Sequence, residues 1–154
     1  MNTAAWSYGN GTSSIAATCD GGTWTFSGTV GVSNDEGANA AGFGFALMGY
    51  VHDTTADADV DCSAFDLSAY TGLSISLASA SGAISTVGIG VDLAGGGKGE
   101  KKISVSETAT EVTLTWSDLG ISDALQIKGI WGYFVNGEAD VTVDLVIDKF
   151  GPQQ

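Results

Sequence analysis

Two aromatic residues and one carboxylate in this sequence have the spacing expected of a surface that holds a sugar. Trp131 and Tyr133 stand at positions i and i+2 of one predicted strand, so an extended backbone places both rings on one face. Flat rings cover the apolar C–H patches of a pyranose, and fixed polar groups select its hydroxyls. Asp92, which follows Gly88 and Gly90 on the polar face of another predicted strand, can accept hydrogen bonds from those hydroxyls.

The opposite assignment of faces stays open for these residues. A β-bulge at Gly129 would change the register, so that Trp131 and Tyr133 become core residues and Phe134 is exposed. For Asp92 the alternative is a solvated aspartate at the end of a strand. The pattern therefore predicts an aromatic platform but leaves a core role as its competitor.

Other aromatics and the single histidine are further candidates. Trp24 shares a face with another aromatic residue and is ambiguous between a sugar contact and the core. Tyr50 is the last residue of a predicted strand, and His52 is the first residue of the acidic loop after it. We predict both as sugar-binding residues. Trp6 and Tyr8 lie in a segment rich in Gly and Asn, where they would either flank a groove or cover one end of the fold.

The two cysteines, Cys19 and Cys62, are an even count in an acidic domain rich in small residues. This arithmetic predicts one structural Cys19–Cys62 disulfide and an oxidising compartment, with two buried free thiols as the alternative. The two positions are too far apart for a C-x-x-C redox or zinc motif.

An acidic run at 57–61, DADVD, offers a second kind of chemistry. Three carboxylates at alternate positions project to one side of an extended strand and invite a cation. An EF-hand is excluded, because Cys62 stands where that loop needs Gly and Ser68 where it needs Glu. A solvated acidic loop and an irregular calcium site both stay open.

Composition narrows the class of protein. The 154 residues suit one domain over 1–154, and 23 glycines with a single proline favour many turns between strands. Five lysines, no arginine and 18 acidic residues give a net charge of −13, which excludes a phosphate-binding surface for nucleic acid and disfavours anionic membranes. No run approaches the ~20 apolar residues of a membrane span. The first residues show no signal-peptide pattern, so we expect an excised domain.

The elements that must position these side chains are short strands. Leu73, Ile75 and Leu77 alternate with small polar residues after the turn at 68–72, which is the half-buried strand pattern that recurs along the chain. Asp20-Gly21-Gly22, the glycine run at 95–99 and Asn136-Gly137 predict hairpins. About nine strands at this spacing indicate an all-β, two-sheet sandwich. They are expected at 15–18, 23–27, 42–50, 73–77, 87–93, 103–105, 112–116, 125–135 and 141–147.

Three pieces of the sequence resemble a known family. NAAGFGFAL at 39–47, FDLSAYTGLSISLAS at 65–79 and IKGIWGYFVNGEADVTVDLVIDKF at 127–150 are similar to the β-jelly-roll carbohydrate-binding modules of the galactose-binding-domain-like superfamily. VGIGVDLAG and VTLTWSDLG stand where that family has its middle strands. The resemblance covers most of the chain from about residue 40 onward, and its FDLSAYTG turn and closing IDKF are the most characteristic parts.

The resemblance implies a jelly roll that binds plant or microbial polysaccharides without catalysis. Such modules belong to secreted, extracellular glycoside hydrolases, so the implied partner in the chain is the catalytic domain of a multi-domain enzyme. Many members hold one structural calcium, with a carboxylate at the start of the closing IDKF-like turn. Asp148 occupies that position here. The first forty residues carry no acidic ligand pattern that matches the family's calcium site.

Catalysis has little support in these residues. The chain has one histidine and no arginine, and neither a G-x-S-x-G elbow nor an H-E-x-x-H motif is present. Glycosidases need only two carboxylates, so a small polysaccharide-degrading enzyme stays open as an alternative. A structural or adhesive sandwich without a sugar site is the other alternative to non-catalytic carbohydrate binding.

Overall fold

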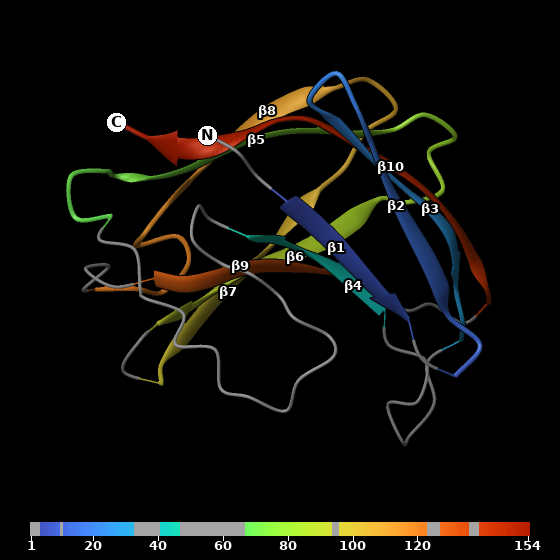
Figure 1. Ribbon diagram of the computed structural model, residues 1–154, viewed down its shortest axis with the longest axis horizontal. Helices are drawn as coiled ribbons and strands as arrows, with labels where there is room; N and C mark the ends of the chain where they lie inside the picture. Colours follow the sequence, from blue (N-terminus) through green and yellow to red (C-terminus); the bar gives the residue numbers. More distant parts are fainter. Residues whose placement is uncertain are drawn as a thin grey trace.

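The computed structural model describes residues 4–9, 11–32, 41–46, 67–93, 96–122, 127–135 and 139–154. Within these described residues, ten strands form two antiparallel sheets of five strands each. Figure 1 shows these sheets as two layers, with β5, β8 and β10 in one and β6, β7 and β9 in the other. The described residues contain no helix, and therefore no helix that is long and apolar enough to cross a membrane. The predicted two-sheet jelly-roll sandwich is therefore confirmed.

Each sheet takes strands from both halves of the chain. In spatial order, sheet A holds β1 (Ala4–Gly9), β4 (Ala41–Ala46), β9 (Ile127–Phe134), β6 (Thr86–Leu93) and β7 (Lys98–Ser104). Sheet B holds β2 (Ser14–Asp20), β3 (Thr23–Val30), β10 (Val141–Gln153), β5 (Gly72–Ser79) and β8 (Thr110–Thr115). The strand beyond the nine expected is β1, which lies at the edge of sheet A.

The core lies between the sheets and follows the alternation in the sequence. Phe43 of sheet A is fully buried, and its ring centroid lies 4.8 Å from that of Phe26 in sheet B and 5.4 Å from that of Phe134 in β9. Hydrophobic residues at every second position of β5, β6 and β10 complete this core: Leu73, Ile75, Leu77, Val87, Ile89, Val91, Val143, Leu145 and Ile147. Burying these faces is the main source of stability in a sandwich of two sheets.

Two of the three hairpin predictions hold. β2 and β3 pair around the turn at 20–22, where Gly21 and Gly22 adopt φ of 58° and 90°. β6 and β7 also pair, across the glycine run. The hairpin expected at Asn136-Gly137 is wrong, because β9 belongs to sheet A and β10 to sheet B. Both flanking strands find other partners, which overrides the local turn signal; residues 136–138 themselves lie outside the described residues.

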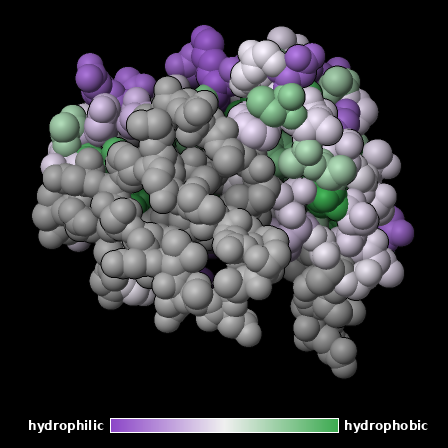
Figure 2. All heavy atoms as spheres, in the orientation of Figure 1, coloured by the Kyte–Doolittle hydropathy of each residue, from purple (hydrophilic) through white to green (hydrophobic). Residues whose placement is uncertain are grey.

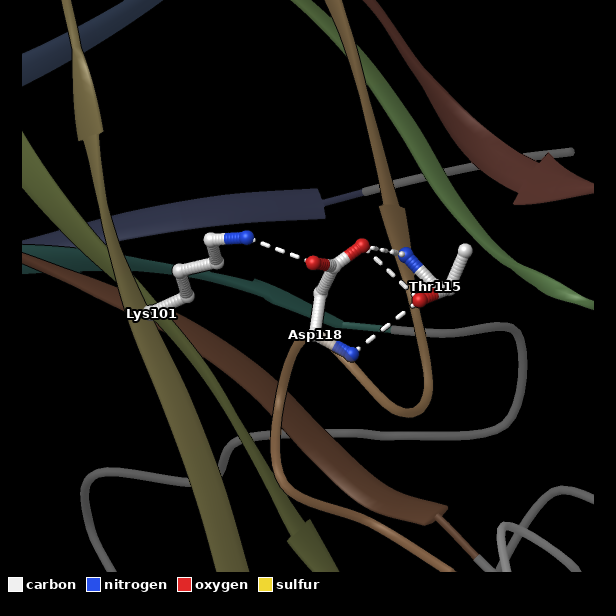
Figure 3. Close-up of polar contacts among 3 residues, drawn as sticks. All are labelled: Lys101, Thr115 and Asp118. Carbon is white, nitrogen blue, oxygen red and sulfur yellow. Dashed lines mark hydrogen bonds and ion pairs between the residues drawn. The ribbon is translucent and has the colours of Figure 1, made fainter.

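An ion pair connects the sheets at one edge of the sandwich (Figure 3). Lys101 of β7 donates to Asp118 Oδ1 over 2.5 Å, and Oδ2 accepts from the Thr115 amide at 3.0 Å and the Thr115 hydroxyl at 2.8 Å. The hydrogen bond from Lys101 and those from Thr115 lower the pKa of Asp118 to about 2. Asp118 therefore fixes the turn after β8 and attaches it to β7, the strand at one edge of sheet A.

The described surface is mainly polar. Among described residues, the large hydrophobic side chains that are exposed are Tyr8, Val32 and Val135. On the face drawn in Figure 2, hydrophobic atoms form small patches between hydrophilic and intermediate residues. This distribution suits a domain whose apolar residues are used inside the sandwich.

Candidate functional site

The site is built on the outer face of sheet A. Ile130 and Phe134 of β9 are each 2% exposed and point into the sandwich, whereas Trp131 and Tyr133 are partly exposed. Alternation along the strand therefore places both rings on the outer side. Their centroids are 6.1 Å apart and their planes differ by 32°, so the two rings form one gently bent surface. The alternative, in which Trp131 and Tyr133 are core residues and Phe134 is exposed, is therefore wrong.

Glycines lie directly beneath both rings. In the register of β9 with β6, Tyr133 is opposite Gly88 and Trp131 is opposite Gly90. The three atoms nearest to where a Cβ of Gly88 would stand all belong to the Tyr133 ring, and those nearest to a Cβ of Gly90 all belong to Trp131. The rings thus lie across β6 instead of standing up from β9. Both glycines are buried as a result.

Glu100 of β7 supplies a carboxylate beside the rings. It pairs with Gly90, and its Oε1 accepts a hydrogen bond of 3.4 Å from the Tyr133 hydroxyl. Desolvation, the negative charge of Glu100 and this hydrogen bond together raise the pKa of Tyr133. The phenol therefore stays protonated in neutral and mildly alkaline solution and remains a hydrogen-bond donor. Sequence reasoning missed Glu100, although folding the predicted β6–β7 hairpin would have placed it opposite Gly90.

Asp92 belongs to the same outer face. It is exposed, lies two residues beyond Gly90 on β6, and pairs with Gly129 on one side and Lys98 on the other. The structure therefore brings Asp92 together with Trp131 and Tyr133, as the sequence suggested.

Tyr8 of β1 adds a third ring to this face. It pairs with Gly42 of β4, which in turn pairs with Tyr133, so the two tyrosines occupy one row across the sheet. The Tyr8 hydroxyl and Cε1 lie less than 3.0 Å from where a Cβ of Gly42 would stand. Its side chain is 42% exposed, and desolvation raises its pKa. Of the two roles left open for Tyr8, the structure favours the one beside a binding surface.

The other sequence candidates are not gathered here. Trp24 lies in β3 of sheet B and packs against the core, so its expected role in sugar binding is not supported. The reason is its spacing from Phe26, which is fully buried and shares its face. Tyr50 and His52 lie outside the described residues.

The metal and disulfide expectations gain no support from the described residues. Asp148 is exposed at an irregularity in the pairing of β10 with β5. Nowhere in the described ranges do three His, Cys, Asp or Glu side chains come together as metal ligands, so these residues alone do not build a calcium site around Asp148. Cys19 is an exposed free thiol, and no Cys19–Cys62 disulfide is found. Cys62 and the acidic run at 57–61 lie outside the described residues.

No protein-family model and no curated protein matches this sequence. Solved structures do match its fold. The family 11 carbohydrate-binding module of the cellulosomal cellulase Lic26A-Cel5E of Clostridium thermocellum aligns with a TM-score of 0.65 at 12% identity, over 99% of this chain and 88% of that chain.

Two further solved structures extend the comparison. The family 11 module from Clostridium thermocellum in complex with a β-1,3-1,4-mixed-linked tetrasaccharide aligns with a TM-score of 0.66 at 12% identity, over 97% of this chain and 88% of that chain. The agarase AgWH50C aligns with a TM-score of 0.60 at 10% identity, over 93% of this chain but 24% of that chain. At such low identity the likeness establishes the fold: this chain has the jelly-roll sandwich found in family 11 carbohydrate-binding modules and in part of an agarase.

Proposed function

We propose that this protein is a non-catalytic carbohydrate-binding module whose binding surface is the outer face of sheet A. The observation that carries the proposal is the pair of partly exposed rings, Trp131 and Tyr133, lying 6.1 Å apart over a glycine-lined strand. One of the matching family 11 modules was solved in complex with a β-1,3-1,4-mixed-linked tetrasaccharide, which supports a carbohydrate as the class of ligand.

The mechanism is stacking with polar selection. The apolar faces of successive sugar rings cover Trp131 and Tyr133 and release the water held there. The carboxylates of Glu100 and Asp92 accept hydrogen bonds from sugar hydroxyls at the rim of the platform. Part of the acceptor capacity of Glu100 is already used by the Tyr133 hydroxyl, at 3.4 Å.

Such an open and wet surface binds weakly by itself. Attachment to the catalytic domain of an extracellular polysaccharide-degrading enzyme would provide a high effective concentration of substrate near that domain. We therefore extend the proposal to a secreted module of a larger enzyme that acts on plant or microbial polysaccharide.

Affinity electrophoresis tests the binding proposal. Gels containing β-glucan, xylan, mannan, pectin or agarose are compared with a gel lacking polysaccharide, and at least one should retard the protein. Trp131→Ala and Tyr133→Ala should each weaken that retardation about tenfold or more, because aromatic anchors dominate such interfaces. Trp24→Leu removes a tryptophan from the opposite sheet and should leave retardation unchanged. Equal retardation of wild type and both platform variants would refute the proposal.

A competing role as a polysaccharide-degrading enzyme is tested with the same material. Asp92 and Glu100 are the described carboxylates beside the rings, and both are exposed instead of lying in an apolar pocket of the kind that makes a proton donor. Incubation with each polysaccharide should release no reducing ends. Release that disappears in Glu100→Gln or Asp92→Asn would replace the binding proposal with a catalytic one.

A further inference from the structure

We propose that Gly88 and Gly90 are positioning residues of the platform, which let Tyr133 and Trp131 lie flat and so present their faces to sugar. The inference rests on the proposed function and adds the residues that set the plane of the rings. Neither glycine offers a side chain to a ligand. Each acts through the ring above it.

The geometry of the two pairs is the first argument. A Cβ on Gly88 would lie less than 3.0 Å from Cε1, Cζ and Cδ1 of Tyr133, a separation that real Cβ atoms essentially never show. A Cβ on Gly90 would lie equally close to Cζ2, Cη2 and Cε2 of Trp131. In both cases the three nearest atoms are ring atoms of the cross-strand partner. Each ring occupies the space where a side chain of β6 would stand.

Backbone conformation does not explain these glycines. Neither Gly88 nor Gly90 is among the glycines with positive φ, so any residue could adopt their extended backbone. Glycine in the interior of a strand is unfavourable, since it gains flexibility in the unfolded chain and packs nothing. The described structure therefore gives one steric reason for glycine at both positions, which is the ring lying on top.

A related arrangement occurs elsewhere on this face. The Tyr8 hydroxyl and Cε1 lie less than 3.0 Å from where a Cβ of Gly42 would stand, although the nearest atom there is the Gly132 carbonyl oxygen of β9. In the strand order of sheet A, each ring reaches from its own strand toward the same edge, the one formed by β7. Rings that recline in one direction expose their faces, which is what stacking on a pyranose requires.

A methyl group at either position should lift the ring above it. Both rings are partly exposed, so each can rotate toward solvent and the fold need not change. What is lost is the flat orientation. Gly88→Ala and Gly90→Ala should therefore weaken sugar binding while the melting midpoint stays close to that of the wild type.

Gly151 provides a matched control. It lies in β10 of sheet B, away from the platform, and a Cβ there would meet nothing within 4 Å. Gly151→Ala should bind as the wild type does. Binding is measured for all variants with the polysaccharide that retards the wild type most strongly, and Gly88→Ala and Gly90→Ala should each lose affinity by up to about tenfold, the size of one aromatic contact. Near-ultraviolet circular dichroism should change in Gly90→Ala and not in Gly151→Ala, because only the former moves an indole.

A double-mutant cycle separates positioning from a general structural role. In a Trp131→Ala background there is no ring to lift, so adding Gly90→Ala should weaken binding no further. If Gly90→Ala alone fails to fold, the substitution is tested in a Trp131→Phe protein instead. A phenyl ring lacks the outer indole atoms that the new methyl group would meet. The double variant should then bind as Trp131→Phe alone.

The outcomes distinguish this inference from the proposed function. Loss of binding in Trp131→Ala with normal binding in both Gly88→Ala and Gly90→Ala would overturn the role of the glycines and leave the binding site standing. An additional loss from Gly90→Ala in the Trp131→Ala background would also overturn it. Normal binding in Trp131→Ala and Tyr133→Ala, or no retardation on any gel, would remove the proposed function and the inference together.

Discussion

Gly132 stands between the two platform residues and faces the opposite way, so its replacement tests the orientation of the whole strand. A Cβ on Gly132 would lie less than 3.0 Å from Cζ, Cε2 and Cε1 of Phe43. Phe43 is fully buried and contacts Phe26 of the other sheet and Phe134 of β9. Unlike the rings on the outer face, it has no solvent into which it can move.

The cost of Gly132→Ala follows from this confinement. Forcing one extra methyl group into a well-packed core typically costs about 1–3 kcal/mol. For a domain of this length, each kcal/mol lowers the melting midpoint by roughly 2–4 °C, so we expect a decrease of roughly 2–12 °C. A domain with the usual stability of about 5–15 kcal/mol would remain folded at room temperature.

Urea unfolding followed by tryptophan fluorescence measures the effect. The midpoint should fall with the slope unchanged, because the surface exposed on unfolding is the same. Gly129→Ala, in the same strand with open space around it, is the control and should not destabilise. Phe43→Leu removes the ring atoms that the methyl would strike, so Gly132→Ala should cost at least about 0.5 kcal/mol less in that background. A Gly132→Ala protein as stable as Gly129→Ala would refute the placement of Phe43 over β9.

Three further predictions concern charge and metal. Asp118→Asn should lower the stability of the folded protein at neutral pH. Because the pKa of Asp118 in the folded protein is lowered to about 2, the stability difference from wild type should shrink as the pH falls from about 4 toward 2. Acid-unfolding curves of the two proteins measure this difference. Glu100→Gln should bring the pKa of Tyr133 closer to its ordinary value in an absorbance titration, with Glu111→Gln on sheet B as the control that leaves it unchanged. If a structural calcium is bound, as the family resemblance implies, a chelator should lower the melting midpoint, and Asp148→Asn should abolish this effect of the chelator. Equal midpoints with and without chelator would exclude a structural ion.

Alternation carried most of what could be predicted about the fold. It separated Ile130 and Phe134 from Trp131 and Tyr133, and it placed Asp92 beside the glycines of β6. These inferences depend on one strand at a time, and period-2 patterns are local. The all-β class and the two glycine hairpins were accessible for the same reason.

Relations between distant strands could not be read from the sequence. Asn136-Gly137 has a strong hairpin composition, yet β9 and β10 pair with β4, β6, β3 and β5, strands that lie far away in the chain. Trp24 shares a face with Phe26, which the sequence shows, but which face of that strand meets the other sheet was decided by sheet packing. The pairing of β1 with β4 places Tyr8 in the same row as Tyr133, and no local sequence pattern indicates this pairing.

Among the described strands, none pairs with the outer edge of β7, and this has a consequence for how the protein behaves at high concentration. An unpaired strand border is a template on which another molecule can add its own strand, and natural sheets prevent this with charges, above all lysine and charges directed inward. β7 holds three of the five lysines of the chain, Lys98, Lys101 and Lys102. Lys101 lies between the buried Gly99 and Ile103, on the inward side of the strand, where it reaches Asp118. A second copy docking along this edge would have to bury that ammonium group, so self-association through β7 is disfavoured, also at the high local concentration that the proposed binding to a polysaccharide would produce.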